Sequence, residues 1–140
     1  MTRIDFYSTS GNKLLVACQI SAKAARQGMR VMVLAPEDGQ LRRLDQLMWT
    51  WQPTGFLAHC VLPHKLSATT PVTLARDETH ALHDEVLINL GAAPPEHFAR
   101  FQRVAELVGP EETDRSAARE RFRFYRDRGY EIQHHQLAAQ

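Results

Sequence analysis

The sequence predicts a single α/β domain that spans residues 1–140. Segments with strand character alternate along the chain with segments of helical periodicity. Two of the strand candidates, 31–34 and 86–90, are nearly continuous apolar runs, as in strands that are covered on both faces. A length of 140 residues suits one domain with a sizeable core. We therefore expect a three-layer, Rossmann-like sandwich with a mostly parallel sheet.

A strand, helix and strand open the chain. Residues 3–7 alternate and are rich in β-formers, and the loop that follows ends at Asn12, which has good helix-capping chemistry. The apolar residues of 13–27 fall on one helical face, and Gly28 stands where a left-handed C′ residue is common. Residues 30–35 form the second strand. A right-handed crossover between the two strands predicts that they are parallel neighbours in the sheet.

The same signals predict the remaining elements: a helix at 39–49, strands at 56–62, 72–74 and 86–90, a helical turn from 94–95, and a helix at 111–128. Asp38 is the expected N-cap of the first of these helices. The apolar residues near 103–108 fit the period of a helix as well as that of a strand. The β-branched Val104 and Val108 and the break at 109–110 favour a strand. Residues 130–135 are a weaker strand candidate.

Composition favours a cytoplasmic protein. No apolar run approaches the roughly 18 residues that span a bilayer, and Asp5 stands where a signal peptide would be apolar. Cys18 and Cys60 cannot form a disulfide framework, and both fit a reducing compartment. We expect neither a membrane anchor nor secretion.

Enzyme chemistry is weakly supported, although an α/β hydrolase or a nucleotide-binding enzyme stays open as the alternative. No G-x-G-x-x-G follows a strand, no G-x-S-x-G exists, and the histidines lack the paired spacing of zinc ligands. Acids near predicted strand ends are the best catalytic candidates: Asp5, Asp38 and Asp84. Such acids are also ordinary caps. We expect no catalytic residue, no cofactor and no metal.

The most informative segment is rich in arginine. Six arginines lie between residues 115 and 128, against Glu120 and Asp127, while the whole chain carries a net charge of only +1. A helical advance of about 100° per residue brings four of them into an arc of about 80°: Arg115, Arg119, Arg123 and Arg126. Beside this arc lie apolar side chains at 118, 122 and 125.

This helical face suits a ligand with several carboxylates and a hydrophobic end, because guanidinium groups bind carboxylates and an apolar strip accommodates the rest. Alternatively, the face is an ordinary solvated one, and Phe122 and Tyr125 anchor the helix to the sheet. Direct binding of nucleic acid is less well supported, since the face is short and no aromatic platform for bases is evident. A second feature, the aromatic cluster of Trp49, Trp51 and Phe56, either closes the core or anchors a partner.

Several segments together resemble the chi subunit of the bacterial DNA polymerase III holoenzyme, an accessory subunit of the clamp loader. They cover nearly the whole chain: Ile4 to Tyr7, Ala25 to Gly28, Arg30 to Val33, Leu44 to Trp49, Phe56 to His59, Asp84 to Leu90, Phe101 to Val108 and Ala118 to Arg126. No single segment is diagnostic, but their order and spacing form a combination that few other folds would reproduce.

The resemblance implies a non-catalytic replisome adaptor that acts during DNA replication. Family members are similar in binding the acidic, phenylalanine-ended C-terminal tail of single-stranded DNA-binding protein, and in joining the clamp loader through a 1:1 heterodimer with the psi subunit. Carried over residue by residue, the tail-binding positions are Arg115, Arg119, Arg123, Val108 and Phe122. The psi-facing positions include Trp49 and Phe56. The resemblance implies no cofactor and no strong direct contact with nucleic acid.

Overall fold

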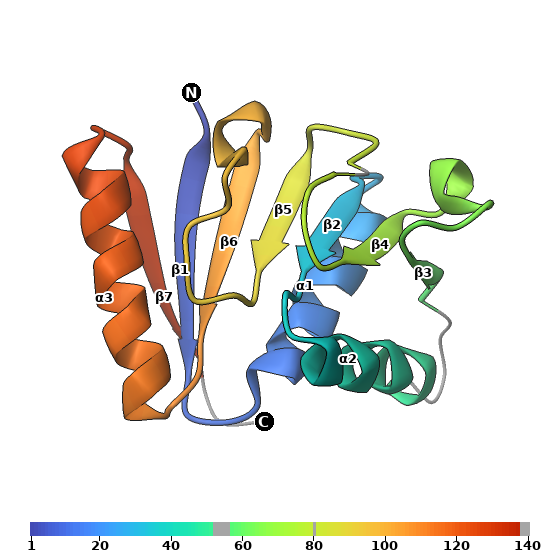
Figure 1. Cartoon of the computed structure of the whole chain (residues 1–140), viewed down its shortest axis with the longest axis horizontal. Coiled ribbons are helices and arrows are strands. Elements are labelled where there is room, and N and C mark those ends of the chain that lie inside the picture. The colour runs from blue at the N-terminus through green and yellow to red at the C-terminus, as the bar shows by residue number, and fades with distance from the viewer. Residues whose placement is uncertain (52–56, 80, 138–140) are drawn as a thin grey trace.

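The computed structural model of the protein describes residues 1–51, 57–79 and 81–137 (Figure 1). In this part of the chain the strands are β1 (Arg3–Thr9), β2 (Val31–Leu34), β3 (His59–Val61), β4 (Val72–Ala75), β5 (Val86–Asn89), β6 (Arg103–Val108) and β7 (Ile132–Leu137). The α-helices are α1 (Lys13–Arg26), α2 (Asp38–Thr50) and α3 (Glu112–Asp127). Short 3-10 helices lie at Ser67–Thr69 and Phe98–Arg100.

The strands of the described residues form one sheet in the order β3-β4-β2-β5-β6-β1-β7. Every pairing in it is parallel. The predicted α/β fold is therefore confirmed, but the expected pairing of the first two strands is wrong. Two strands, β5 and β6, lie between β1 and β2. The crossover helix α1 spans this gap, and a strand–helix–strand unit does not specify how many strands separate its ends.

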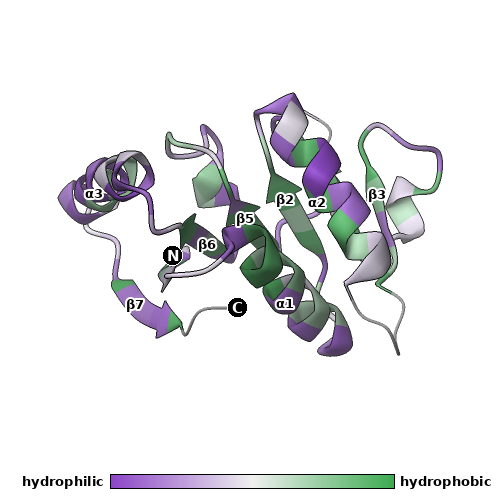
Figure 2. Ribbon diagram, turned by 90° about the horizontal axis from the view of Figure 1, so that it is seen from below, coloured by the Kyte–Doolittle hydropathy of each residue, from purple (hydrophilic) through white to green (hydrophobic). Residues whose placement is uncertain are grey.

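The helices cover the sheet in two layers. One core cluster joins α1 and α2 to one face, on which Val33, Ile88 and Leu107 are fully buried. The other joins α3 to the opposite face, on which Ile4, Leu87 and Val104 are fully buried. Figure 2 shows central strands coloured hydrophobic and an α3 that is largely hydrophilic. These layers form the expected three-layer sandwich.

Local capping accounts for both ends of α1 and for the C-terminal end of α3. Asn12 Oδ1 accepts a hydrogen bond of 2.9 Å from the Leu14 amide at the start of α1. Gly28 and Gly129 have φ angles of 79° and 83°, the left-handed conformation predicted for the residues after α1 and α3. Asp38 is not the N-cap of α2, because the helix begins at Asp38 itself and Glu37 takes the cap position. The Asp38 carboxylate instead pairs with Arg76 at 2.9 Å.

The uncertain segments resolve as strands. Residues 103–108 form β6, as favoured, and the last strand runs from 132 to 137 instead of from 130 to 135. The strand expected at 56–62 is the shorter β3, and residue 56 lies outside the described residues. The helical turn expected from 94–95 begins at Phe98. Within the described residues, no helix has the length and apolar character needed to cross a membrane.

Candidate functional site

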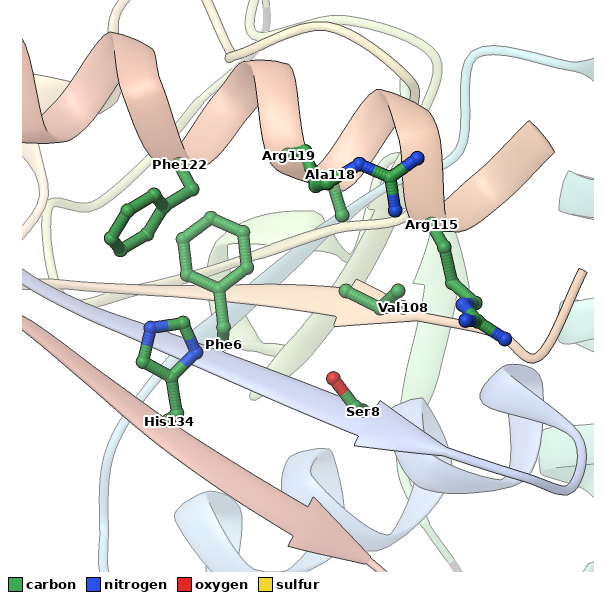
Figure 3. Close-up of a pocket in the computed structure, with 8 residues that line it drawn as sticks. All are labelled: Phe6, Ser8, Val108, Arg115, Ala118, Arg119, Phe122 and His134. Carbon is green, nitrogen blue, oxygen red and sulfur yellow. The ribbon is translucent and has the colours of Figure 1, made fainter. Parts of the chain in front are cut away.

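A cavity of about 300 Å³ lies between α3 and the three strands at that end of the sheet (Figure 3). Its lining comes from α3, β1, β6 and β7: Phe6, Ser8, Val108, Arg115, Ala118, Arg119, Phe122 and His134. This volume is at the lower limit of pockets that hold a small ligand or a few side-chain groups. The cavity is formed by segments that are distant in sequence and adjacent in the fold.

One end of the cavity is aromatic. The Phe6 and Phe122 rings meet edge to face with centroids 6.2 Å apart, and the His134 ring stacks on Phe6 at 5.7 Å and lies 5.3 Å from Phe122. Figure 3 shows these three rings gathered together, with Val108 farther along the cavity floor. Such an end favours an apolar or aromatic side chain, which gains both burial and ring contacts.

The other end of the cavity is cationic. Arg119 Nη2 lies 2.8 Å from Oε1 of Glu112, and Arg115 Nε lies 3.9 Å from Oε2 of the same carboxylate. The hydrogen bond from Arg119 holds the pKa of Glu112 below its ordinary value. One carboxylate thus lies within ion-pair distance of both guanidinium groups, and Arg119 also donates a hydrogen bond to it.

The remaining arginines of the predicted arc lie outside the lining of this cavity. Arg123 forms an ion pair with Glu120, one turn farther along the exposed face of α3. Arg126 pairs with Asp127 at 3.1 Å, and its guanidinium carbon lies 5.9 Å from the centre of the Phe122 ring. Of the five tail-binding positions that the resemblance implies, the structure brings four to the cavity: Val108, Arg115, Arg119 and Phe122.

One of the six arginines does not belong to the basic surface at all. Arg121 is fully buried, and its Nε lies 2.7 Å from Oε1 of Glu106, which is also fully buried. Tyr125 donates a hydrogen bond of 2.5 Å to the other carboxylate oxygen, and Asn89 donates one of 2.9 Å to Oε1. Burial raises the pKa of Glu106, while Arg121 and the hydrogen bonds oppose that effect. This network fixes α3 to β6 and so fixes the position of the cavity wall.

The start of α3 is held as well. Asp114 accepts hydrogen bonds from the Gly109 amide at 2.5 Å and from Lys13 Nζ at 2.9 and 3.0 Å. The loop after β6 is thereby tied to the first residue of α1. Arg115 follows Asp114 in α3, so the contacts of Asp114 with the loop and with α1 also fix the backbone from which the Arg115 side chain projects.

Sequence reasoning missed three residues of the cavity: Phe6, Ser8 and His134. The alternation in residues 3–9 places Phe6 and Ser8 on one face, but it does not reveal that α3 covers that face. The His134 ring stacks on Phe6 although the residue is exposed. The pairing of Phe6 with His134 in the β1–β7 register puts both side chains on the same face.

The second predicted surface lies at the opposite end of the sheet. Trp49 is 57% exposed, and its ring lies 4.6 Å from the buried His59 ring. A hollow beside it is lined by Arg43, Gln46, Leu47, Trp49 and Thr50. Trp51 packs partly buried against the core, so the aromatic cluster divides into a core residue and an exposed one. Phe56 lies outside the described residues.

Two of the three acids named as catalytic candidates, Asp5 and Asp38, form ion pairs with arginine side chains. The fully buried Asp5 carboxylate meets Arg103 Nε at 3.0 Å, Arg3 Nε at 3.1 Å and His135 Nε2 at 2.9 Å. His59 is held by Asp45 at 3.1 Å. Among the described residues, no three metal-ligating side chains gather in a group that could hold a metal ion.

Comparison with known proteins gives a consistent set of relatives. The family model of the DNA polymerase III chi subunit, HolC, matches residues 1–133. The chain is 40% identical to the DNA polymerase III subunit chi of Pseudomonas aeruginosa over 98% of each chain. It is 26% identical to the subunit chi of Escherichia coli over 84% of this chain and 80% of the relative. It is 23% identical to that of Haemophilus influenzae over 91% and 92%.

Proposed function

This chain belongs to the family of the DNA polymerase III chi subunit, and on that basis we propose that it is a replisome adaptor. As a chi subunit it is a non-catalytic part of that polymerase. In this proposal it works in the cytoplasm during DNA replication. It binds the acidic C-terminal tail of single-stranded DNA-binding protein and links that protein to the clamp loader through the psi subunit.

One observation supports tail binding above all: a single cavity has an aromatic end and a cationic end. A peptide that ends in phenylalanine offers an aromatic ring and a terminal carboxylate on one residue. In the proposed complex the ring packs against the aromatic end formed by Phe6, Phe122 and His134. The terminal carboxylate takes the place of Glu112 between Arg115 and Arg119. Val108 contributes an apolar surface to the floor of the cavity.

Arg123 has a smaller part in this proposal than the resemblance implies. It is exposed, it is paired with Glu120, and it lies outside the lining of the cavity. Its charge adds to the positive potential of α3 and thereby raises the rate at which an acidic tail arrives. We assign it no direct contact with the terminal residue.

The test is an anisotropy titration of a fluorescently labelled acidic hexapeptide that ends in phenylalanine. Arg119→Ala removes one charge-assisted contact and should weaken binding by about 5- to 150-fold, the equivalent of about 1–3 kcal/mol. Arg26→Ala is the matched control, because it removes one exposed charge from α1 on the other side of the sheet. If the two variants bind the peptide equally well, the proposed tail site is wrong.

A separate surface around Trp49 is the proposed contact with the psi subunit. The exposed indole adjoins a hollow lined by α2, at the end of the sheet opposite to α3 (Figure 1). Phe56 stays part of this proposal from the resemblance alone. Two sites at opposite ends of the sheet would let the protein hold both partners at once, as a linker must.

A further inference from the structure

A second cavity, of about 360 Å³, continues from the cavity under α3. The two share Ser8, Val108 and Arg115, so together they form one groove. The additional lining comes from the ends of neighbouring strands and the loops after them: Thr9, Ser10, Gly109, Pro110 and Gln136. The first cavity has three aromatic rings at one end, whereas the second is lined mainly by residues with hydroxyl and amide side chains and by the buried Gly109.

The topology explains why a groove opens at this place. β1 and β6 are parallel neighbours, but β1 leads into α1 on one face of the sheet and β6 leads into α3 on the opposite face. The two connecting loops therefore separate at the carboxyl edge of the sheet. In open α/β sheets, ligands bind in the crevice at such a switch point. This chain lacks the glycine pattern for a dinucleotide there, and its groove presents an arginine and hydroxyl groups.

The direction of a bound peptide follows from the two ends of the first cavity. Phe6, Phe122 and His134 have ring centroids 5.3 to 6.2 Å apart, which leaves no passage for a polypeptide between them. Figure 3 shows Arg115 at the far end, reaching toward the end of β1. For a peptide whose last side chain packs against the rings, the groove formed by the two cavities offers the main chain a route past Arg115.

We infer that this second cavity holds the acidic residues that precede the terminal residue of the peptide. The inference rests on the proposed function and deepens it, because it names the reach and the direction of the bound segment. Arg115 contacts both parts of the peptide, since it lines both cavities. Ser10 and Gln136, which are exposed, offer hydrogen-bonding groups to the peptide backbone from the two walls.

The test uses two peptides and the full-length chain labelled with nitrogen-15. One peptide is the acidic hexapeptide that ends in phenylalanine, and the other is a capped dipeptide with the same terminal residue. In chemical-shift titrations the hexapeptide should shift the amide signals of Thr9, Ser10 and Gln136, which line only the second cavity, whereas the dipeptide should shift only signals of residues that line the first. Equal shifts from both peptides at Ser10 and Gln136 would overturn the inference.

A charge placed in the second cavity gives the quantitative result. Ser10→Glu should weaken the hexapeptide by about fivefold, as one like-charge contact at about 4 Å in water predicts, and leave the dipeptide within about twofold. Ser10→Gln is the control, because glutamine has the size of glutamate but carries no charge. Gln136→Glu places the same charge on the opposite wall of the second cavity, and it replaces Ser10→Glu if that variant has a lowered melting temperature.

The outcomes separate this inference from the proposed function. If the glutamate variants bind the hexapeptide as well as the wild type does, the preceding residues lie elsewhere and the inference is wrong, while the tail site stands. If both peptides weaken equally, the charge acts at long range and the inference is again wrong. If neither peptide binds the wild type, the proposed function fails and the inference fails with it.

Discussion

The two ends of the sheet present different surfaces. At the β7 end, α3 lies over the sheet and leaves a cavity with an aromatic end and a cationic rim. At the β3 end, a strand of three residues forms the edge, and α2 presents an exposed indole beside an open hollow. A cavity suits a short flexible segment, whereas a protruding aromatic side chain suits a folded partner that encloses it.

The difference also concerns rigidity. The wall of the cavity is held by the buried pair of Arg121 and Glu106, by Tyr125 and, at the start of α3, by Asp114. At the other end, the Trp49 indole lies 4.6 Å from the His59 ring and is more than half exposed. A rigid cavity costs less conformational entropy when a disordered tail binds, so the two ends should respond differently to substitution.

Removing the buried carboxylate should have the largest effect. Glu106→Ala leaves the Arg121 guanidinium buried without its partner and should lower the free energy of unfolding by about 3–5 kcal/mol. Urea denaturation followed by circular dichroism measures this loss. The double variant Glu106→Leu with Arg121→Met removes both charges and should recover most of it. A loss below about 1 kcal/mol in the single variant would show that the pair does not hold α3.

Trp49→Ala should separate the two ends. Because the indole is more than half exposed, the free energy of unfolding should fall by less than about 1.5 kcal/mol, and the lost ring contact with His59 should account for part of that fall. Binding of the psi subunit should weaken by more than about 2 kcal/mol, while the acidic hexapeptide binds as before. Calorimetric titration with psi and anisotropy with the peptide measure the two effects.

The matched control for this prediction is Arg119→Ala, which should show the opposite pattern: retained psi binding and weakened peptide binding. A severe loss of stability in Trp49→Ala would instead assign the indole to the core. Loss of both partners in either variant would contradict the independence of the two ends.

Sequence patterns revealed the elements better than their arrangement. Periodicity located α1, α2, α3 and most of the strands, and the resemblance supplied four side chains that line the cavity. Strand order was not accessible, because β1 pairs with β6 and β7 across most of the chain length. For the same reason Phe6 and His134 were missed. Their role depends on a pairing between residues more than a hundred positions apart.

Arg121 illustrates a second limit. Helical geometry placed it outside the basic arc, but its charge was still counted as surface charge. Its burial depends on Glu106 from β6, a carboxylate that appears in the sequence as an isolated acid within an apolar strand. That acid was the available signal: a charged residue inside a buried strand requires a charged or hydrogen-bonding partner. Arg121 lies four residues before Tyr125 and so shares its face of α3, which would have suggested this arginine as the partner.

Within the basic face of α3, Arg115 and Arg123 should differ. Both are exposed arginines of the same helix, but Arg115 lines both cavities and Arg123 lines neither. Arg115→Ala should weaken the hexapeptide by about 5- to 150-fold, whereas Arg123→Ala should weaken it by about fivefold or less. Raising the salt concentration should shrink the effect of Arg123→Ala more, because a distant charge is screened more than a contact. Equal effects at both positions would favour a diffuse basic face over a defined site.

The smallest expected effect concerns Glu112, which lies where the terminal carboxylate of the tail is proposed to bind. Its pKa is held below the ordinary value by the hydrogen bond from Arg119, so it is ionised at neutral pH and competes with the peptide. Glu112→Gln removes this competitor and should raise the affinity for the hexapeptide by about two- to fivefold, the range of an exposed ion pair.

Glu111→Gln is the matched control for Glu112→Gln, since it removes the same charge from the neighbouring residue, which caps α3. If the rise in affinity came only from the change in net charge, the two variants would bind the peptide equally and would converge in high salt. A larger rise for Glu112→Gln that persists at high salt requires the direct contact with Arg119. It would also distinguish this end of the sheet from the Trp49 end, where neither glutamine substitution should alter psi binding, because that contact depends on an aromatic side chain.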